Sequence, residues 1–286
     1  MTSSVESSLV SRLAAGETVV MPGVWDAWSA LVARRAGFDT VFVSGFAVSG
    51  TLLGRPDAGL LGQTEVADVA RRVCAAVPDV AVVVDADTGY GNAMNVRRTV
   101  ELWESAGAAG MFLEDQTWPK RCGHQPNKEV VAADEWLAKV RAALDTRTSL
   151  FVTARTDARG ALGLDEAIER GKRARDLGAD AVFVEAPASV DELQTIARAI
   201  PDVPLVANMA EKSATAHLSV GELADLGFRL LVSPVTLLLA ATAAADEAAL
   251  HLRSSGRSTQ TRDRFDDFDS LVGLAEHRHV EERYRT

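Results

Sequence analysis

The feature that most constrains the fold is a unit that recurs eight times along the chain. Each unit begins with a short run rich in β-branched residues, at 19–21, 41–43, 81–84, 110–113, 150–154, 181–184, 205–207 and 230–232. A polar or glycine turn follows each run, and an alanine-rich amphipathic stretch follows most of the turns, as at 27–36. Strands that alternate with helices predict a parallel sheet, and eight strands are the number that closes a barrel.

The composition of the runs supports a covered, parallel sheet. Runs such as VFVSG and AVVVD are apolar on consecutive residues, which is typical of strands buried on both faces. A doubly wound open sheet is the alternative, but its glycine-rich first turn is missing. We therefore expect an α/β chain with a (β/α)8 TIM barrel over residues 1–253.

The last part of the chain, residues 254–286, has a different character. It is charged, with apolar Phe265, Phe268, Leu271 and Leu274 at helical spacing. Such a stripe predicts a helical extension that packs on something outside the barrel. The extension could pack on a neighbouring subunit or form a lid over the same barrel, and the sequence leaves both alternatives open.

Charge and cysteine content exclude several classes of protein. The formal net charge of −10 argues against nucleic acid or an anionic membrane as a partner, though it leaves room for a small anionic substrate. Two cysteines give no disulfide framework, which favours a reducing cytoplasm. The N-terminus lacks the basic and apolar regions of a signal peptide, and the most apolar late stretch, 237–249, is too short to span a bilayer.

Polar side chains gather where the predicted strands end. In a barrel these C-terminal ends share one face, and that face carries the active site. We therefore expect one mouth to hold Asp85, Asp87, Glu114, Arg155, Glu185 and Asn208.

Two of these carboxylates predict a metal. Asp85 and Asp87 are two residues apart, so on an extended strand they share a face. With Glu114 from the next strand they make an oxygen-rich site, which suits Mg²⁺ or Mn²⁺. The alternative is that one aspartate caps a helix and the other forms a salt bridge.

The stretch KRCGH is the strongest chemical signal. Lys120 and Arg121 precede Cys122, and Gly123 and His124 follow it. Cations lower the pKa of a nearby thiol, so Cys122 is a candidate to handle a proton. The alternative is a solvated basic turn with an incidental cysteine, and a lone loop histidine is more often solvated.

Two further groups could bind an anionic substrate. Ser44 and Gly45 offer a hydroxyl and backbone N–H groups to a carboxylate or an enolate oxygen. The Arg155 guanidinium could bind a carboxylate through two hydrogen bonds. It could equally form an ion pair with Glu185 or Asp157.

Six stretches together carry a family resemblance. SGFAVSGTLLGRPDAG, DADTGYGNAMNV, LEDQTWPKRCGH, ARTDAR, FVEAP and ANMAE, in this order, resemble the isocitrate lyase and phosphoenolpyruvate mutase superfamily. The likeness runs from about Pro22 to the last predicted strand. It is greatest to the lyase branch, which includes methylisocitrate lyase, 2,3-dimethylmalate lyase and the petal death protein. Phosphoenolpyruvate mutase itself lacks the cysteine found here at Cys122.

The resemblance implies a cofactor, an assembly and a set of site residues. It implies Mg²⁺ held by Asp85 and Asp87, with Asp57 and Glu114 acting through waters, and a homotetramer (a dimer of dimers) whose last barrel helix is swapped between subunits. The implied catalytic residues are Lys120, Cys122, His124 and Glu114. The implied substrate-binding residues are Ser44, Gly45, Phe46, Asp57, Gly123, Arg155, Glu185, Asn208 and Pro234.

The implied activity is a Mg²⁺-dependent carbon–carbon lyase. Its substrate would be a 2-hydroxy di- or tricarboxylate such as a 2-alkylmalate, 2,3-dimethylmalate or methylisocitrate. The chain has Phe42 where methylisocitrate lyase has a tyrosine, and Pro234 where the oxaloacetate hydrolases have a serine. A phosphonate-pathway enzyme like carboxyphosphonoenolpyruvate mutase, an oxaloacetate hydrolase and a non-catalytic metabolite-binding protein are the alternatives.

Overall fold

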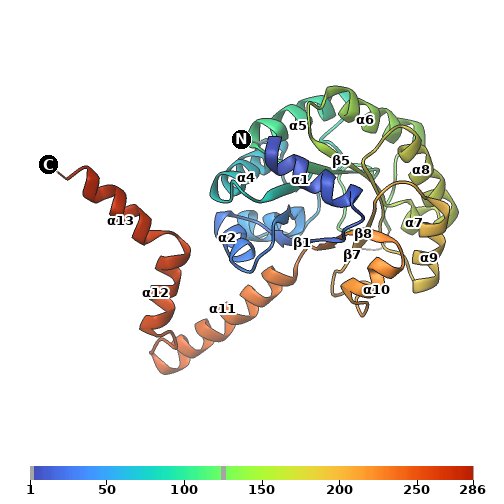
Figure 1. The fold of residues 1–286 in the computed structure, drawn as a ribbon. Coiled ribbons are helices and arrows are strands. Elements are labelled where there is room, and N and C mark those ends of the chain that lie inside the picture. Colours follow the sequence, from blue (N-terminus) through green and yellow to red (C-terminus); the bar gives the residue numbers. More distant parts are fainter. Residues whose placement is uncertain (1–2, 124–126, 286) are drawn as a thin grey trace.

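The structure is a computed structural model that describes residues 3–123 and 127–285. Eight parallel strands close into a barrel in chain order, so the predicted TIM barrel is confirmed (Figure 1). The strands are β1 Val19–Val24, β2 Thr40–Val43, β3 Ala81–Asp85, β4 Gly110–Glu114, β5 Phe151–Thr156, β6 Ala181–Val184, β7 Leu205–Asn208 and β8 Phe228–Ser233.

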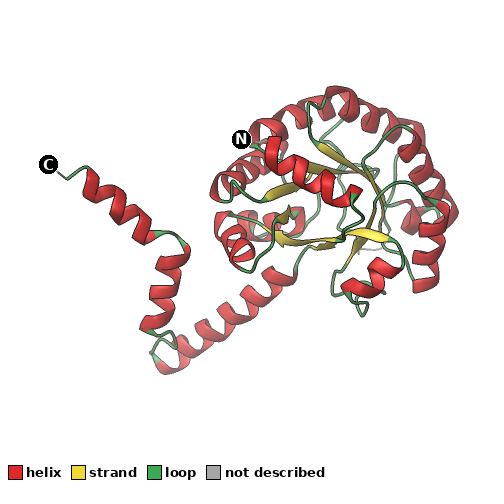
Figure 2. Ribbon diagram, viewed as in Figure 1, coloured by secondary structure: helices red, strands yellow, loops and turns green. Residues whose placement is uncertain are grey.

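Helices surround the barrel and fill most of the crossovers between strands (Figure 2). They are α1 Ser3–Ala14, α2 Ala27–Arg35, α3 Gly45–Val48, the π-helix η1 Ser49–Leu53, α4 Gln63–Ala76, α5 Ala93–Ala106, α6 Ala133–Thr146, α7 Ala158–Ala161, α8 Leu164–Asp176, α9 Val190–Ala199, α10 Val220–Asp225, α11 Thr236–Ser255, α12 Arg262–Leu271 and α13 Leu274–Arg283. Among these described elements, none is long and apolar enough to cross a membrane.

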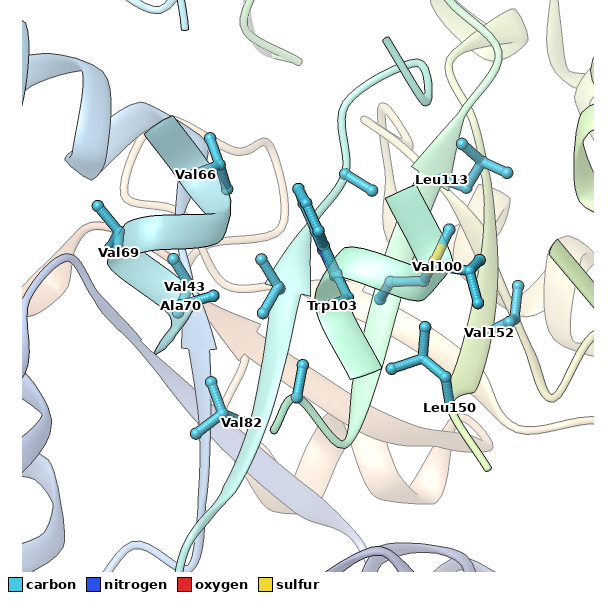
Figure 3. Packing of buried hydrophobic residues seen from close by; sticks show 14 of the residues in the cluster. Val43, Val66, Val69, Ala70, Val82, Val100, Trp103, Leu113, Leu150 and Val152 are labelled. Carbon is cyan, nitrogen blue, oxygen red and sulfur yellow. The ribbon is translucent and has the colours of Figure 1, made fainter. Parts of the chain in front are cut away.

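Alternation along the strands divides the core into layers. Side chains such as Val82, Leu113 and Val152 face outward and pack under α4 to α6, where Trp103 is fully buried (Figure 3). Phe42 and Phe112 belong to the inner layer, which α1 joins with Leu9. Because Leu9 clusters with residues at the starts of the strands, α1 closes the N-terminal end of the barrel, and the opposite end stays available for a site.

The C-terminal helices leave the barrel as an arm, which is orange to red in Figure 1. No residue of α11, α12 or α13 is buried, and Phe265 and Phe268 are at least half exposed. An ion pair between Arg35 and Asp267 connects α12 to α2. The predicted single helical stripe is wrong in one respect: Gly273, with a positive φ of 77°, separates α12 from α13, so the stripe lies on two helices. The division of the chain after residue 253 stays a prediction, and α11 runs across that position.

Candidate active site

A cavity of about 270 Å³ opens at the C-terminal ends of the strands. Most of the predicted site residues line it: Ser44, Phe46, Asp57, Asp85, Lys120, Cys122, Gly123, Arg155, Glu185, Asn208 and Pro234. Gly45, Asp87 and Glu114 do not line it but lie directly behind it, as their contacts below show. His124 falls outside the residues that the structure describes.

The two aspartates converge, although not in the way the sequence predicted. β3 ends at Asp85, and Asp87 lies beyond it in a turn with a positive φ of 45°, so the two do not share a strand face. Aspartate tolerates this left-handed conformation better than most residues do, and the turn places the backbone N–H of Asp87 3.2 Å from Asp85 Oδ1. A Cβ at Gly45 would lie 2.9 Å from Asp85 Oδ2 and 3.5 Å from Asp87 Oδ1, so both carboxylates point at Gly45. Neither aspartate caps a helix.

Lys120 holds this carboxylate cluster together. Its Nζ lies 2.5 Å from Asp57 Oδ1 and 2.8 Å from Asp87 Oδ1, and all three side chains are buried. Burial would lower the pKa of Lys120, but Asp87, Asp57, Asp85 and Glu114 outweigh it and raise the pKa well above its ordinary value. Burial also raises the pKa of Asp87, to about 6, despite the nearby ammonium. The sequence placed Lys120 beside the thiol, whereas the structure directs its ammonium at the carboxylates.

The donor set fits a hard divalent cation. Asp57, Asp85, Asp87 and Glu114 are buried around one lysine, and burial raises the pKa of both Asp87 and Glu114 because the nearby cations do not fully offset it. Glu114 Oε1 is buried without a hydrogen-bond partner among the described residues, and Asp87 Oδ1 lies 2.8 Å from Lys120 Nζ in an ion pair. Within residues 3–123 and 127–285, no three acidic, histidine or cysteine side chains form a ligating group, so direct protein ligands would be few. Mg²⁺ commonly takes one or two carboxylates and keeps several waters, which is compatible with Asp85 and Asp87 as ligands.

Arg155 forms the ion pairs that the sequence left open. Its Nε lies 2.9 Å from Asp157 Oδ2, and its Nη2 lies 3.4 Å from Glu114 Oε2 and 3.6 Å from Glu185 Oε2. Burial alone would lower the pKa of Arg155, but these three carboxylates raise it well above its ordinary value. The guanidinium is therefore always charged, and Arg155 also lines the cavity.

Residues on either side of the cavity complete its walls. Ser44 caps α3 by accepting a hydrogen bond from Ala47 N at 3.4 Å. Asn208 Nδ2 lies 3.3 Å from Glu185 Oε2, which keeps the amide at the cavity wall. The segment before His124 comes back over the strand ends and brings Cys122, which is half-buried, to the same cavity as Arg155.

An aromatic floor was missed by the sequence reasoning. The Phe112 ring packs against Phe42 with centroids 4.8 Å apart and planes tilted by 40°, and it meets Phe183 edge-on at 5.7 Å. Arg155 Cζ lies 5.4 Å from the centre of the Phe183 ring. Strand alternation could have predicted these aromatic residues, because residues two apart on a strand face the same way. Phe112 and Phe183 each precede a predicted site carboxylate by two residues. Glu211, Lys212 and Leu239 also line the cavity. Glu211 ends the ANMAE stretch but was not predicted as a site residue, and no pattern in the sequence singled out Lys212 or Leu239.

Comparison with known proteins identifies relatives of this fold and site. The family model described as phosphoenolpyruvate phosphomutase matches residues 10–253. Carboxyvinyl-carboxyphosphonate phosphorylmutase from Arabidopsis thaliana is 44% identical over 93% of this chain and 80% of its own length. 2,3-Dimethylmalate lyase from Eubacterium barkeri is 41% identical over 96% of each chain.

A solved structure gives the same assignment. The crystal structure of 2,3-dimethylmalate lyase superposes with a TM-score of 0.94 at 32% identity, covering 98% of this chain and 95% of that one. This chain therefore belongs to the phosphoenolpyruvate phosphomutase family within the isocitrate lyase and phosphoenolpyruvate mutase superfamily, and it is an enzyme related to the carbon–carbon lyases of that superfamily.

Proposed function

We propose that the protein is a Mg²⁺-dependent lyase that cleaves a 2-hydroxy di- or tricarboxylate, of the 2-alkylmalate, 2,3-dimethylmalate or methylisocitrate type, to an α-keto acid and a carboxylic acid. One observation carries the proposal: a single cavity is lined both by an anion-binding set, with Arg155, Ser44 and Asn208, and by the thiol of Cys122. Anchoring and proton delivery are the two tasks that this cleavage requires.

Each residue has a task that follows from its place. When bound at Asp85 and Asp87, Mg²⁺ would supply electrostatic stabilisation of negative charge on the 2-oxygen. Arg155 would bind the carboxylate of the half that leaves as the α-keto acid. Lys120 keeps the carboxylates of Asp57 and Asp87 in place while the charge on the substrate changes.

The proton balance defines the role of Cys122. A base takes the proton of the 2-hydroxyl group, the C2–O bond becomes a carbonyl, and the C2–C3 bond breaks. Its electron pair stays on C3 as a carbanion next to a carboxylate. The Cys122 thiol donates its proton to C3, which releases the carboxylic acid, and the thiolate regains a proton before the next turnover.

The name of one relative raises a second candidate. Carboxyvinyl-carboxyphosphonate phosphorylmutase is a phosphorus-transfer enzyme by its name, and it is 44% identical to this chain. The relative named 2,3-dimethylmalate lyase is 41% identical, and the crystal structure of 2,3-dimethylmalate lyase superposes with a TM-score of 0.94, which supports the lyase.

A substrate panel separates these candidates. Purified enzyme with Mg²⁺ is given a set of 2-alkylmalates and methylisocitrate, and pyruvate is measured with lactate dehydrogenase. Phosphonate substrates are followed by phosphorus NMR, and oxaloacetate is followed by its loss of absorbance. We expect release of keto acid from a member of the hydroxy-acid panel. Turnover confined to a phosphonate or to oxaloacetate would overturn the proposal.

Replacing the thiol tests the mechanism itself. A hydroxyl is a much weaker acid than a thiol, so in Cys122→Ser the proton donor is lost while the shape is kept. Turnover should fall by roughly two to four orders of magnitude. Substrate binding should change much less, because Arg155 still holds the keto-acid half. A Cys122→Ser enzyme within a few-fold of wild type would exclude the thiol as the proton donor.

We also propose that the enzyme works in the cytoplasm as a homotetramer. The arm of α11 to α13 exposes Phe265, Phe268 and Val272, with no buried residue of its own. A second copy of the chain would cover these side chains. Light scattering of the intact protein tests this assembly.

A further inference from the structure

The backbone on both sides of Cys122 is fastened by buried side chains that no part of the proposed chemistry uses. On the N-terminal side, the Gln116 amide makes two hydrogen bonds to Arg121: its Nε2 donates to Arg121 O at 2.9 Å, and its Oε1 accepts from Arg121 N at 2.9 Å. Gln116 is itself only 2% exposed, although Arg121 is at the surface. Both hydrogen-bonding groups of this buried amide therefore hold the backbone of Arg121, the residue before the thiol.

On the C-terminal side, Lys128 makes the matching contact. Its Nζ donates to the carbonyl oxygen of Gly123 at 2.7 Å and lies 2.6 Å from Asp157 Oδ1. The Lys128 side chain is 4% exposed. A Cβ at Gly160 would lie only 3.2 Å from Lys128 Cε, so the glycine leaves the space through which the lysine reaches inward.

Asp157 connects this contact to the substrate-binding arginine. Its carboxylate accepts from Arg155 Nε at 2.9 Å, and its backbone N–H donates to Asp115 Oδ1 at 2.7 Å. Burial would raise the pKa of Asp157, but Arg155 and Lys128 lower it to about 2. The carboxylate is therefore ionised and accepts three hydrogen bonds, two from Arg155 and one from Lys128, while the backbone N–H holds Asp115.

From these contacts we infer that Gln116 and Lys128 are positioning residues, which hold Cys122 in register with Arg155 by fixing the backbone before and after the thiol. This inference rests on the proposed role of Cys122. Without Lys128, the Gly123 carbonyl is no longer connected to Asp157. The position of the Cys122 thiol relative to the Arg155 guanidinium is then no longer fixed. A misplacement of about 1 Å can cost roughly 10²-fold in rate.

The test uses two readouts, one of which needs no substrate. Lys128→Met and Gln116→Leu each remove one tether. The control is Lys172→Met in α8, which removes a half-buried ammonium that has no hydrogen bond or ion pair among the described residues. The first readout is kcat and KM on the best substrate of the panel. The second is the rate at which iodoacetamide labels Cys122, measured by peptide mass spectrometry. Cys74 is the only other cysteine, and burial raises the pKa of its thiol to about 12, so it stays unlabelled near neutral pH.

We expect both tether variants to lower kcat by about 10²-fold, to leave KM within a few-fold, and to label Cys122 several times faster than wild type does. Lys172→Met should match wild type in both readouts. A folded variant with unchanged labelling overturns the inference, even if its kcat falls, because Lys128 would then act only through Arg155. If Lys128→Met does not fold, Gln116→Leu decides, since it leaves no charge unpaired. If no substrate in the panel reacts, the proposed function fails, while faster labelling of the variants still supports the tethers.

Discussion

Gly123→Ala perturbs the site at the point where the Cys122 segment touches the substrate-binding residues. A Cβ at this position would lie 2.7 Å from Arg155 Nη2 and 2.9 Å from Glu185 Cδ, closer than real Cβ contacts. Neither neighbour is free to yield: Arg155 is paired with Asp157, and Glu185 accepts hydrogen bonds from Ala186 N at 2.9 Å and from Asn208. The Cys122 segment must therefore move outward.

The size of the effect follows from overpacking. An extra methyl group in a tight contact costs about 1–3 kcal/mol. If this cost falls on the arrangement that reacts, kcat/KM drops by roughly 5- to 160-fold, since 1.36 kcal/mol is tenfold in rate. The melting temperature should stay near that of wild type, because the displaced segment covers the barrel and does not form its core.

The assay is the coupled release of keto acid, run beside thermal unfolding. Gly50→Ala is the matched control: Gly50 lies in η1, and a Cβ there meets no atom within 4 Å. Its activity and melting temperature should equal those of wild type. If Gly123→Ala keeps kcat/KM within twofold of wild type, the arrangement seen here is not the one that reacts.

Three further predictions concern the metal, the pH dependence and the arm. Asp87→Asn should lose the activity that added Mg²⁺ restores after chelation and should keep the circular dichroism of a folded barrel; activity that persists in excess chelator contradicts the metal site. Because the pKa of Asp157 is depressed to about 2, its ionised form stabilises the fold above about pH 4, and this contribution is lost as pH falls from about 4 to about 2. Between about pH 5 and about pH 2, the free energy of unfolding in urea should therefore fall by up to about 2 kcal/mol more in wild type than in Asp157→Asn. Parallel pH curves for the two proteins would refute this. Deletion of the residues after Gly256 should lower the molar mass found by light scattering, whereas an unchanged mass would show that the arm makes no subunit contact.

Strand periodicity and strand ends predicted most of the scaffold and much of the cavity. Residues such as Glu114 and Asn208 could be placed because a parallel barrel brings all strand ends to one face. Asp87 shows where this reasoning fails: a turn residue with positive φ obeys no strand alternation, so the position of its carboxylate could not be read from spacing. Lys128 shows the second limit, since its partner Asp157 lies 29 residues away and only the tertiary fold brings the two together.

One helix joins the cavity to the arm. α11 has 20 residues, which makes it about 30 Å long. Leu239 near its start lines the cavity, and its far end leads to the exposed faces of α12 and α13. If a partner binds those faces only when α11 has one orientation relative to the barrel, that partner also selects one position of Leu239. By thermodynamic reciprocity, a substrate that prefers that position raises the association constant of the partner by the same factor by which the partner raises the affinity for substrate. Dilution would then weaken substrate binding, with no change in any residue that contacts the reacting atoms.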